Sequence, residues 1–303
     1  MALNFAEIAK NFFLIQPLIF FSQAKKATIA NRSLDYTTSR SKPQPSLIVG
    51  GREAKDGEFP FIVALMDPDY PDLHLGAGTL LEPKWILTAQ HMIVDKDNNM
   101  QTVELLVAPK YSNKISEMKG KKRYKVEKMF CHPVDLNMRH ADIGLLKLRE
   151  GIPLGMESSY RFQTISLLRS SNDIDWNKEM QIMGWGLSRH TWNPQPEDFP
   201  DHLMVLSTKL NPTEECKSIF EHSFRSPNSF CVGHEHKTGG MADSGGPAIM
   251  KRVRTNENIQ VGVVSFGRGD ARNVSYFYQW IQDRMNDENS KYECKNVYPQ
   301  RKI

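Results

Sequence analysis

The sequence is poor in three features that mark particular classes of protein. It has only four cysteines in 303 residues, too few for the disulfide framework of a small stapled domain. Its formal net charge is only +4, from 39 Lys+Arg and 35 Asp+Glu, which is far from the strongly basic surface of most nucleic-acid-binding domains. No stretch approaches the roughly 20 unbroken apolar residues of a membrane-spanning helix. We therefore expect no nucleic-acid partner and no membrane span in the mature chain.

The composition is that of a folded globular protein. Apolar residues make up 40% of the chain and charged residues 24%. A chain of this length and composition buries enough apolar surface to fold, and it is too apolar and too evenly charged to be disordered.

The N-terminal region predicts export from the cell. An apolar run at 11–21 is followed by Ser22-Gln23-Ala24, whose small residues suit a signal-peptide cleavage site after residue 24. An unprocessed leader or a misassigned start is the alternative. Residues 25–47 are polar and read as a pro-segment, and we expect one domain at 48–285 and a polar tail at 286–303.

The body of the chain is expected to be β-rich. Short apolar runs separated by turn residues are typical of an antiparallel all-β sandwich or barrel. Only the end appears helical, because Phe277, Trp280, Ile281 and Met285 recur at spacings of three and four. The runs that predict strands are 59–66, 85–89, 103–108, 143–148, 180–186, 202–210, 247–253 and 259–267.

One segment is strongly basic. Residues Lys119 to Lys128 read KGKKRYKVEK. A solvated hairpin is the favoured interpretation, and a patch that binds an anionic ligand is the alternative.

Three short segments carry residues suited to nucleophilic catalysis. They are LTAQH, with His91 after a strand; ADIGLL, with Asp142; and ADSGGP, with Ser244. A serine followed by Gly-Gly-Pro is placed on a tight turn that a substrate backbone can approach closely. The order His, Asp, Ser is one of the known orders of the acyl-transfer triad.

Together with three further segments, these motifs resemble the chymotrypsin/trypsin-like serine endopeptidases. The further segments are Ile48-Val49-Gly50-Gly51, Gly184-Trp185-Gly186 and Val264-Ser265-Phe266-Gly267. All six stand in the family's order and cover about 48–285, so as a set they are highly specific.

The resemblance implies a fold and a reaction. The fold is two packed six-stranded antiparallel Greek-key β-barrels with a C-terminal α-helix and a cleft between the barrels. His91 would take the proton of Ser244 as it attacks the scissile carbonyl, and Asp142 would hold the imidazole. Ser265 would support Asp142, and Ser265, Phe266 and Gly267 would pair with the substrate backbone as an added strand. The resemblance implies no metal and no cofactor.

The resemblance also implies activation by proteolysis. The amino group of Ile48, freed by cleavage, would pair with Asp243 and order an oxyanion hole made by the N–H groups of Ala242 and Ser244. The implied partners are protein or peptide substrates and an activating protease, and we expect a monomer.

Four departures from the family pattern limit this interpretation. Leu47 precedes Ile48 where the family has Arg or Lys, so a trypsin-like activator would not cut there. Ala242 replaces the glycine two positions before the nucleophile, and Thr238 falls at the floor of the specificity pocket, which disfavours an Arg/Lys preference. The segment 265–280 is short and is expected to lack the strand that walls this pocket. The alternative is therefore a catalytically impaired homologue with a binding or regulatory role.

The resemblance makes the cysteines and one modification site interpretable. Cys216 and Cys231 match a disulfide of the family. Cys131 and Cys294 have no family counterpart, but the C-terminal helix of this fold lies near the stretch before Asp142, so we predict a second bridge between them; two free thiols are the alternative. Asn31-Arg32-Ser33 and Asn273-Val274-Ser275 are glycosylation acceptors if the chain is secreted.

Overall fold

The computed structural model describes most of the chain after residue 50. The described residues are 51–68, 74–94, 106–109, 112–133, 141–155, 162–186, 199–220, 224, 226–233, 243–265, 269–287, 289 and 291–294. The signal peptide and pro-segment predicted at 1–24 and 25–47 lie outside them.

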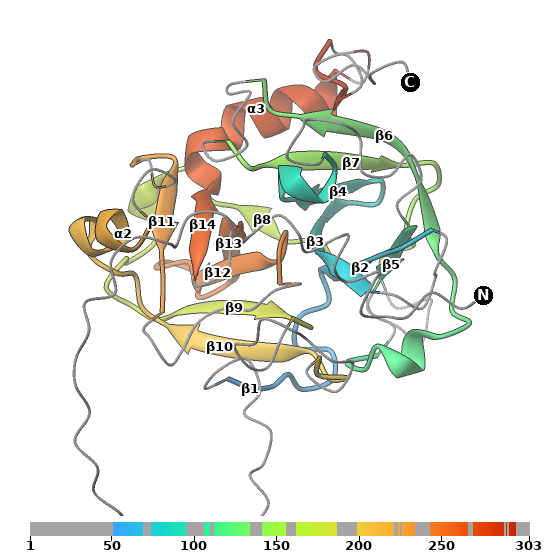
Figure 1. Cartoon of the computed structure of the whole chain (residues 1–303), viewed down its shortest axis with the longest axis horizontal. Coiled ribbons are helices and arrows are strands. Elements are labelled where there is room, and N and C mark those ends of the chain that lie inside the picture. Colours follow the sequence, from blue (N-terminus) through green and yellow to red (C-terminus); the bar gives the residue numbers. More distant parts are fainter. Residues whose placement is uncertain are drawn as a thin grey trace, which may run out of the picture.

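The first half of the chain forms a closed six-stranded barrel (Figure 1). Neighbouring strands pair antiparallel in the closed order β2-β3-β4-β7-β6-β5. Its interior is filled by apolar side chains, including the fully buried Leu65, Ile86 and Phe130. The strands are β2 (Ile62–Met66), β3 (His74–Glu82), β4 (Trp85–Thr88), β5 (Leu106–Pro109), β6 (Tyr124–Cys131) and β7 (Gly144–Leu148).

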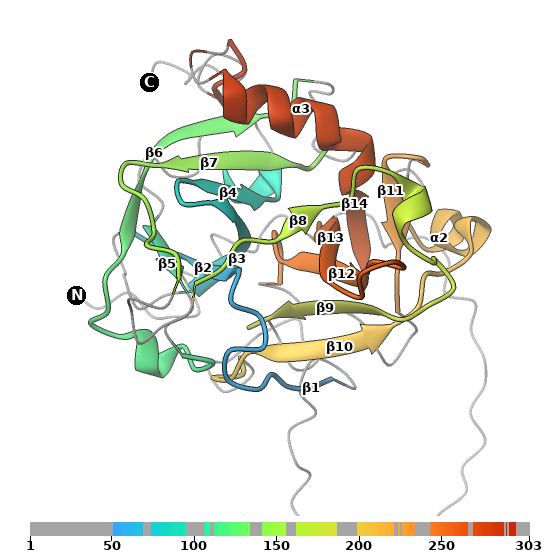
Figure 2. The same ribbon diagram turned by 180° about the vertical axis from the view of Figure 1, so that it is seen from behind.

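The second half is an eight-stranded sheet. Its path runs β1-β10-β9-β12-β13-β14-β11, and β8 pairs with β13 in parallel. Figure 2 shows β8 between the barrel and the rest of the sheet. The strands are β1 (Arg52–Glu53), β8 (Ser166–Leu167), β9 (Met180–Gly184), β10 (Met204–Thr208), β11 (Ser229–Cys231), β12 (Pro247–Lys251), β13 (Asn258–Val264) and β14 (Asp270–Asn273).

The expected all-β fold is confirmed, with two differences in the second half. The expected second six-stranded barrel is an eight-stranded sheet whose pairing does not close among the described strands. The strand expected to be missing between Ser265 and Trp280 is present as β14, which pairs with both β13 and β11. The expectation failed because β14 has the sequence Asp-Ala-Arg-Asn, which has no apolar strand pattern.

An apolar layer joins the two halves. It contains side chains of the barrel, such as Phe61 and Ala77, and of the sheet, such as Trp185 and Val205. All four are less than 5% exposed, so the halves form one packed body and the turns at their junction hold fixed positions.

Two α-helices are present among the described residues. The predicted C-terminal helix is α3 (Val274–Asn286), which buries Phe277 and Ile281 against the barrel core. Figure 1 shows it running from the end of β14 toward β6. The expectation that only the end of the chain is helical is wrong, since α2 (Thr213–Phe220) forms as well. Its apolar residues Cys216, Ile219 and Phe220 span little more than one turn, too short a pattern to predict a helix from the sequence. No helix in the described part of the chain is long and apolar enough to span a membrane.

Both predicted disulfides are present. Cys216 on α2 is bonded to Cys231 on β11, and Cys131 at the end of β6 is bonded to Cys294 beyond α3. The second bond fixes the C-terminal segment on the barrel, where Cys131 N–H donates to the carbonyl of Tyr292 at 3.2 Å. Both cysteines of this bond are fully buried.

The basic segment 119–128 is partly regular structure. It follows the 3-10 turn η3 (Ser116–Met118) and enters β6 at Tyr124, which pairs with β5 as one arm of a hairpin. Lys122 forms an ion pair with Glu150 at 2.9 Å and lies over the ring of Tyr124. An anionic ligand for this segment stays a prediction.

Candidate active site

His91 and Asp142 meet because two paired strands bring them together. The 3-10 turn η2 (Gln90–Met92) follows β4, and Asp142 stands two residues before β7. Since Thr88 at the end of β4 pairs with Gly144 at the start of β7, the residues beyond these ends are neighbours. The Asp142 carboxylate accepts the backbone N–H of His91 at 2.8 Å and lies 2.7 Å from its ring Nδ1.

Ser244 reaches this pair through a tight turn that packs against the barrel. Gly245 has φ +81, and a Cβ there would lie 2.1 Å from Oγ1 of Thr88 and 3.2 Å from the backbone N of Ala89. Ala77 N–H also donates to the carbonyl of Ser244 at 2.9 Å. The turn that carries Ser244 is therefore seated at the end of β4, beside the residue two positions before His91.

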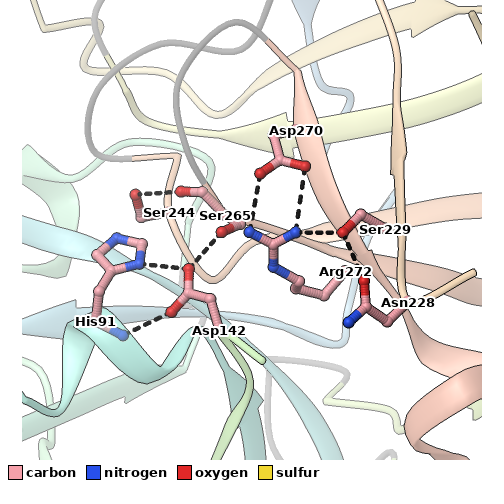
Figure 3. A network of polar contacts seen from close by, with 8 residues as sticks. All are labelled: His91, Asp142, Asn228, Ser229, Ser244, Ser265, Asp270 and Arg272. Carbon is pink, nitrogen blue, oxygen red and sulfur yellow. Dashed lines mark hydrogen bonds and ion pairs between the residues drawn. The ribbon is translucent and has the colours of Figure 1, made fainter. Parts of the chain in front are cut away.

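Ser265, directly after β13, connects Ser244 with Asp142. Its hydroxyl donates to Oδ2 of Asp142, and its carbonyl accepts the hydroxyl of Ser244 at 3.3 Å. Figure 3 shows these four side chains as one cluster, with His91 and Asp142 from the barrel and Ser244 and Ser265 from the sheet. The structure thus places side by side the four residues that the resemblance names, and their catalytic roles stay predictions.

The electrostatics of the cluster favour an ionised Asp142 behind the partly exposed ring of His91. The Asp142 side chain is fully buried and the His91 side chain is 14% exposed. Burial alone would raise the pKa of Asp142, but the charges of His91 and Arg272 and the hydrogen bonds from His91 and Ser265 lower it overall. Such a carboxylate fixes the ring and stabilises its protonated form, so the half-buried Ser244 hydroxyl lies in a site that can accept its proton.

Asp243 is held on the opposite side of the same turn. It is 2% exposed, and its Oδ1 accepts the N–H of Gly186 at 2.8 Å. A Cβ on Gly184 would lie 2.1 Å from that same oxygen, so only glycine at the end of β9 admits the carboxylate. Asp243 is thus a buried acid directly next to the proposed nucleophile.

Several predicted site residues lie outside the described residues. They are Ile48, Thr238, Ala242, Phe266 and Gly267, so their roles in activation, in the oxyanion hole and in substrate binding stay predictions. Among the described side chains, no cluster of His, Cys, Asp and Glu could hold a metal ion.

The sequence interpretation missed two charged residues beside the site. Asp270 and Arg272, both on β14, form a buried ion pair with Nη2 and Oδ2 2.9 Å apart. Their spacing of two residues places both side chains on one face of a strand, a signal that becomes visible only once the segment is recognised as a strand.

Comparison with known proteins agrees with this geometry. Residues 48–285 match the family model named Trypsin. The chain is 27% identical to a venom serine protease of Polistes dominula over 253 residues, 79% of this chain and 85% of the relative. It is 26% identical to Serine protease 28 of Mus musculus over 262 residues, 82% of this chain and 90% of the relative.

Proposed function

The chain belongs to the trypsin family of serine proteases, and from that premise we propose that it is an endopeptidase that hydrolyses peptide bonds through His91, Asp142 and Ser244. The observation that carries the proposal is the continuous network from Ser244 through Ser265 and Asp142 to His91. It joins the two halves of the molecule at one point, with the carboxylate buried and the imidazole accessible.

The proposed reaction follows the geometry of this network. On substrate binding, the Ser244 hydroxyl turns from the Ser265 carbonyl to Nε2 of His91, attacks the scissile carbonyl and gives its proton to the imidazole. Asp142 holds Nδ1 and stabilises the imidazolium. The proton then passes to the leaving amine, and water hydrolyses the acyl-enzyme by the same route.

The decisive test is covalent labelling of Ser244. The protein beginning at Ile48 is incubated with a fluorophosphonate, which loses fluoride and forms a bond to an activated serine hydroxyl. We expect stoichiometric labelling of the wild type and none of Ser244→Ala, with a rate at least about 100-fold lower for His91→Ala because the base is lost. Labelling of the wild type no stronger than that of Ser244→Ala would contradict the proposal.

The proposed activation involves Asp243. The resemblance to the family implies that a freed Ile48 ammonium would pair with this buried carboxylate. We expect the chain that begins at Ile48 to react with the fluorophosphonate and the uncleaved chain to react poorly. Asp243→Asn in the cleaved protein should behave like the uncleaved chain, and equal reactivity of all three would argue against a zymogen. Because Leu47 precedes the bond, an activating protease with an apolar preference is implied.

The remaining parts of the proposal concern setting and specificity. We propose secretion on the basis of the predicted leader and N-glycosylation at Asn273 on the basis of its Asn-Val-Ser acceptor, and we expect a monomer. Thr238 at the expected pocket floor supports cleavage after residues other than Arg or Lys. An anionic ligand at Lys119 to Lys128 would be supported by salt-sensitive heparin binding that is lost when Lys121, Lys122 and Arg123 are neutralised.

The second candidate function is a catalytically impaired homologue that binds a partner. Ala242 and Leu47 favour it, since a Cβ at position 242 can turn one oxyanion donor away, a loss worth roughly 10² to 10³ in rate. Because β14 is present, a missing strand between Ser265 and Trp280 no longer supports this second function. Ala242→Gly distinguishes the two functions: a labelling rate raised about 100-fold indicates an impaired oxyanion hole, and an unchanged rate indicates a competent one.

A further inference from the structure

The ion pair on β14 is buried completely, and three hydrogen bonds to two residues hold Arg272 in place. Arg272 and Asp270 are both 0% exposed. The guanidinium donates to both carboxylate oxygens of Asp270, at 2.9 and 3.4 Å, and to the hydroxyl of Ser229 on β11 at 2.6 Å. Taking two charges out of water carries a large desolvation cost before their attraction is counted, so packing alone does not account for this pair.

The pair is connected to the catalytic cluster through Ser265. The backbone N–H of Ser265 donates to the carbonyl of Asp270 at 2.9 Å, while its hydroxyl donates to Oδ2 of Asp142. Arg272 pairs with Val263, two residues before Ser265 on β13. In Figure 3 the guanidinium group lies near the middle of the polar network, which extends from His91 and Ser244 to Asn228.

The charges of the two acids and the arginine are coupled. The positive charge of Arg272 is one of the causes that lower the pKa of Asp142. Burial raises the pKa of Asp270 to about 6 despite Arg272, and the negative charge of Asp142 adds to that rise. One buried cation therefore contacts Asp270 directly and acts on Asp142 through its charge, an arrangement in which each group affects the ionisation of the others.

We propose that Asp270 and Arg272 are positioning residues for the catalytic Asp142, and that Asp270 prevents Arg272 from competing with His91 for the Asp142 carboxylate. The inference rests on the proposed function. When both carboxylates are ionised and His91 is unprotonated, the charges of Asp142, Asp270 and Arg272 sum to −1. Transfer of the Ser244 proton to His91 brings this sum to zero, so the network is neutral when the imidazolium forms.

Neutralising Asp270 alone would upset this balance. In Asp270→Asn, the positive charge of Arg272 is balanced by Asp142 alone. Protonation of His91 then leaves a buried net charge of +1. Like charges in a buried network disfavour protonation. In the double variant Asp270→Asn/Arg272→Gln the sum returns to −1 with His91 neutral, so the ring regains its attraction for a proton even though more native contacts have been removed.

The test is an NMR titration of His91, which needs no turnover. Full-length protein and protein beginning at Ile48 are labelled with ¹³C-histidine, and the His91 signal is assigned by its loss in His91→Gln. We expect the titration midpoint of Asp270→Asn to lie about one pH unit or more below that of the wild type, and the double variant to return to within about 0.2 pH unit of it. Asp270→Ser replaces Asp270→Asn if the latter does not fold.

A matched control and a clear contrary result complete the design. Asp173→Asn removes the partner of Arg252, 3.8 Å away in a partly exposed ion pair that is not part of the polar network in Figure 3, and should leave the midpoint unchanged. An unchanged midpoint in Asp270→Asn, or the same shift in the single and double variants, would overturn the inference. The titration is independent of catalysis. The expected midpoints in the single and double variants, together with failed fluorophosphonate labelling, would therefore disprove the proposed function and leave the charge coupling standing.

Discussion

At the scale of single residues, Gly245 is the position of the candidate active-site turn that leaves the least room for a side chain. Its φ is +81, and a Cβ would lie 2.1 Å from Thr88 Oγ1 and 2.2 Å from the carbonyl of Ala77. We expect Gly245→Ala to abolish labelling of Ser244 and to lower the free energy of unfolding by about 3 kcal/mol or more, since strain and a backbone clash add. Chemical denaturation measures the second effect.

Gly57 supplies the matched control. It has a similar φ of +73, but a Cβ there would meet nothing within 4 Å. Gly57→Ala should cost only the left-handed conformation, about 1–2 kcal/mol, and leave labelling intact. Similar losses in both variants would mean that the junction with Thr88 and Ala77 is looser than the structure shows.

His132 makes a pH-dependent contribution to stability. Its ring lies 5.1 Å from the rings of Phe277 and Trp280, and burial lowers its pKa to about 4. The unfolded chain protonates this histidine near pH 6.5, so between pH 6.5 and 4 the unfolded state binds more protons and stability falls as the pH falls. His74, whose pKa burial also lowers to about 4, adds to the same loss.

A substitution isolates the His132 contribution. His132→Phe should make the free energy of unfolding fall less steeply between pH 6.5 and 4 than it does in the wild type. Urea titrations at several pH values measure it. A slope for His132→Phe equal to that of the wild type would show that the ring is protonated in the folded protein.

The single residues also show how far sequence reasoning reaches. His91, Asp142 and Ser244 could be named because each stands in a short motif whose residue types serve one chemistry. The Asp270–Arg272 pair could not be, because its meaning depends on β14 lying between β13 and β11. In a linear reading, Asp-Ala-Arg-Asn before a helix is an ordinary polar connection.

At the scale of elements, α3 begins at the capping residue Asn273, which also binds the segment before β11. Asn273 Oδ1 accepts the N–H of Ser275 at 3.1 Å, and its Nδ2 donates to the carbonyl of Pro227 at 3.0 Å. We expect Asn273→Ala to cost about 1 kcal/mol of stability. Asn273→Asp keeps the acceptor and should cost less; thermal melts compare the two. Equal costs would place the stabilisation in the Pro227 contact.

Among the elements, apolar runs predicted strands well and mixed sequences did so poorly. All eight expected runs overlap observed strands. β3 could not be predicted because Gly76 and Gly78 interrupt its apolar pattern. Both positions require glycine, since a Cβ would clash with Met92 at the first and with Ile86 at the second. The closure of one half and the open path of the other follow from register and pairing, which a single sequence does not display.

At the scale of the whole molecule, the two disulfides should differ in their effect on stability. Cys131–Cys294 closes a sequence separation of 163 residues, and Cys216–Cys231 one of 15. Loop-closure entropy then gives about 5 kcal/mol for the first bond and about 3 kcal/mol for the second. Replacing both cysteines of a pair by serine and measuring guanidinium unfolding tests the order, and a larger loss for the shorter loop would contradict it.

The Cys131–Cys294 bond also makes the backbone between these two cysteines a closed ring. The ring includes β7, the whole eight-stranded sheet except β1, and α3. One cut anywhere within it opens the ring but releases no fragment, because each new end remains attached to a covalently continuous chain. A copy of this chain that is cut once between Cys131 and Cys294 would therefore keep its full mass on a non-reducing gel, and only reduction would show the cut.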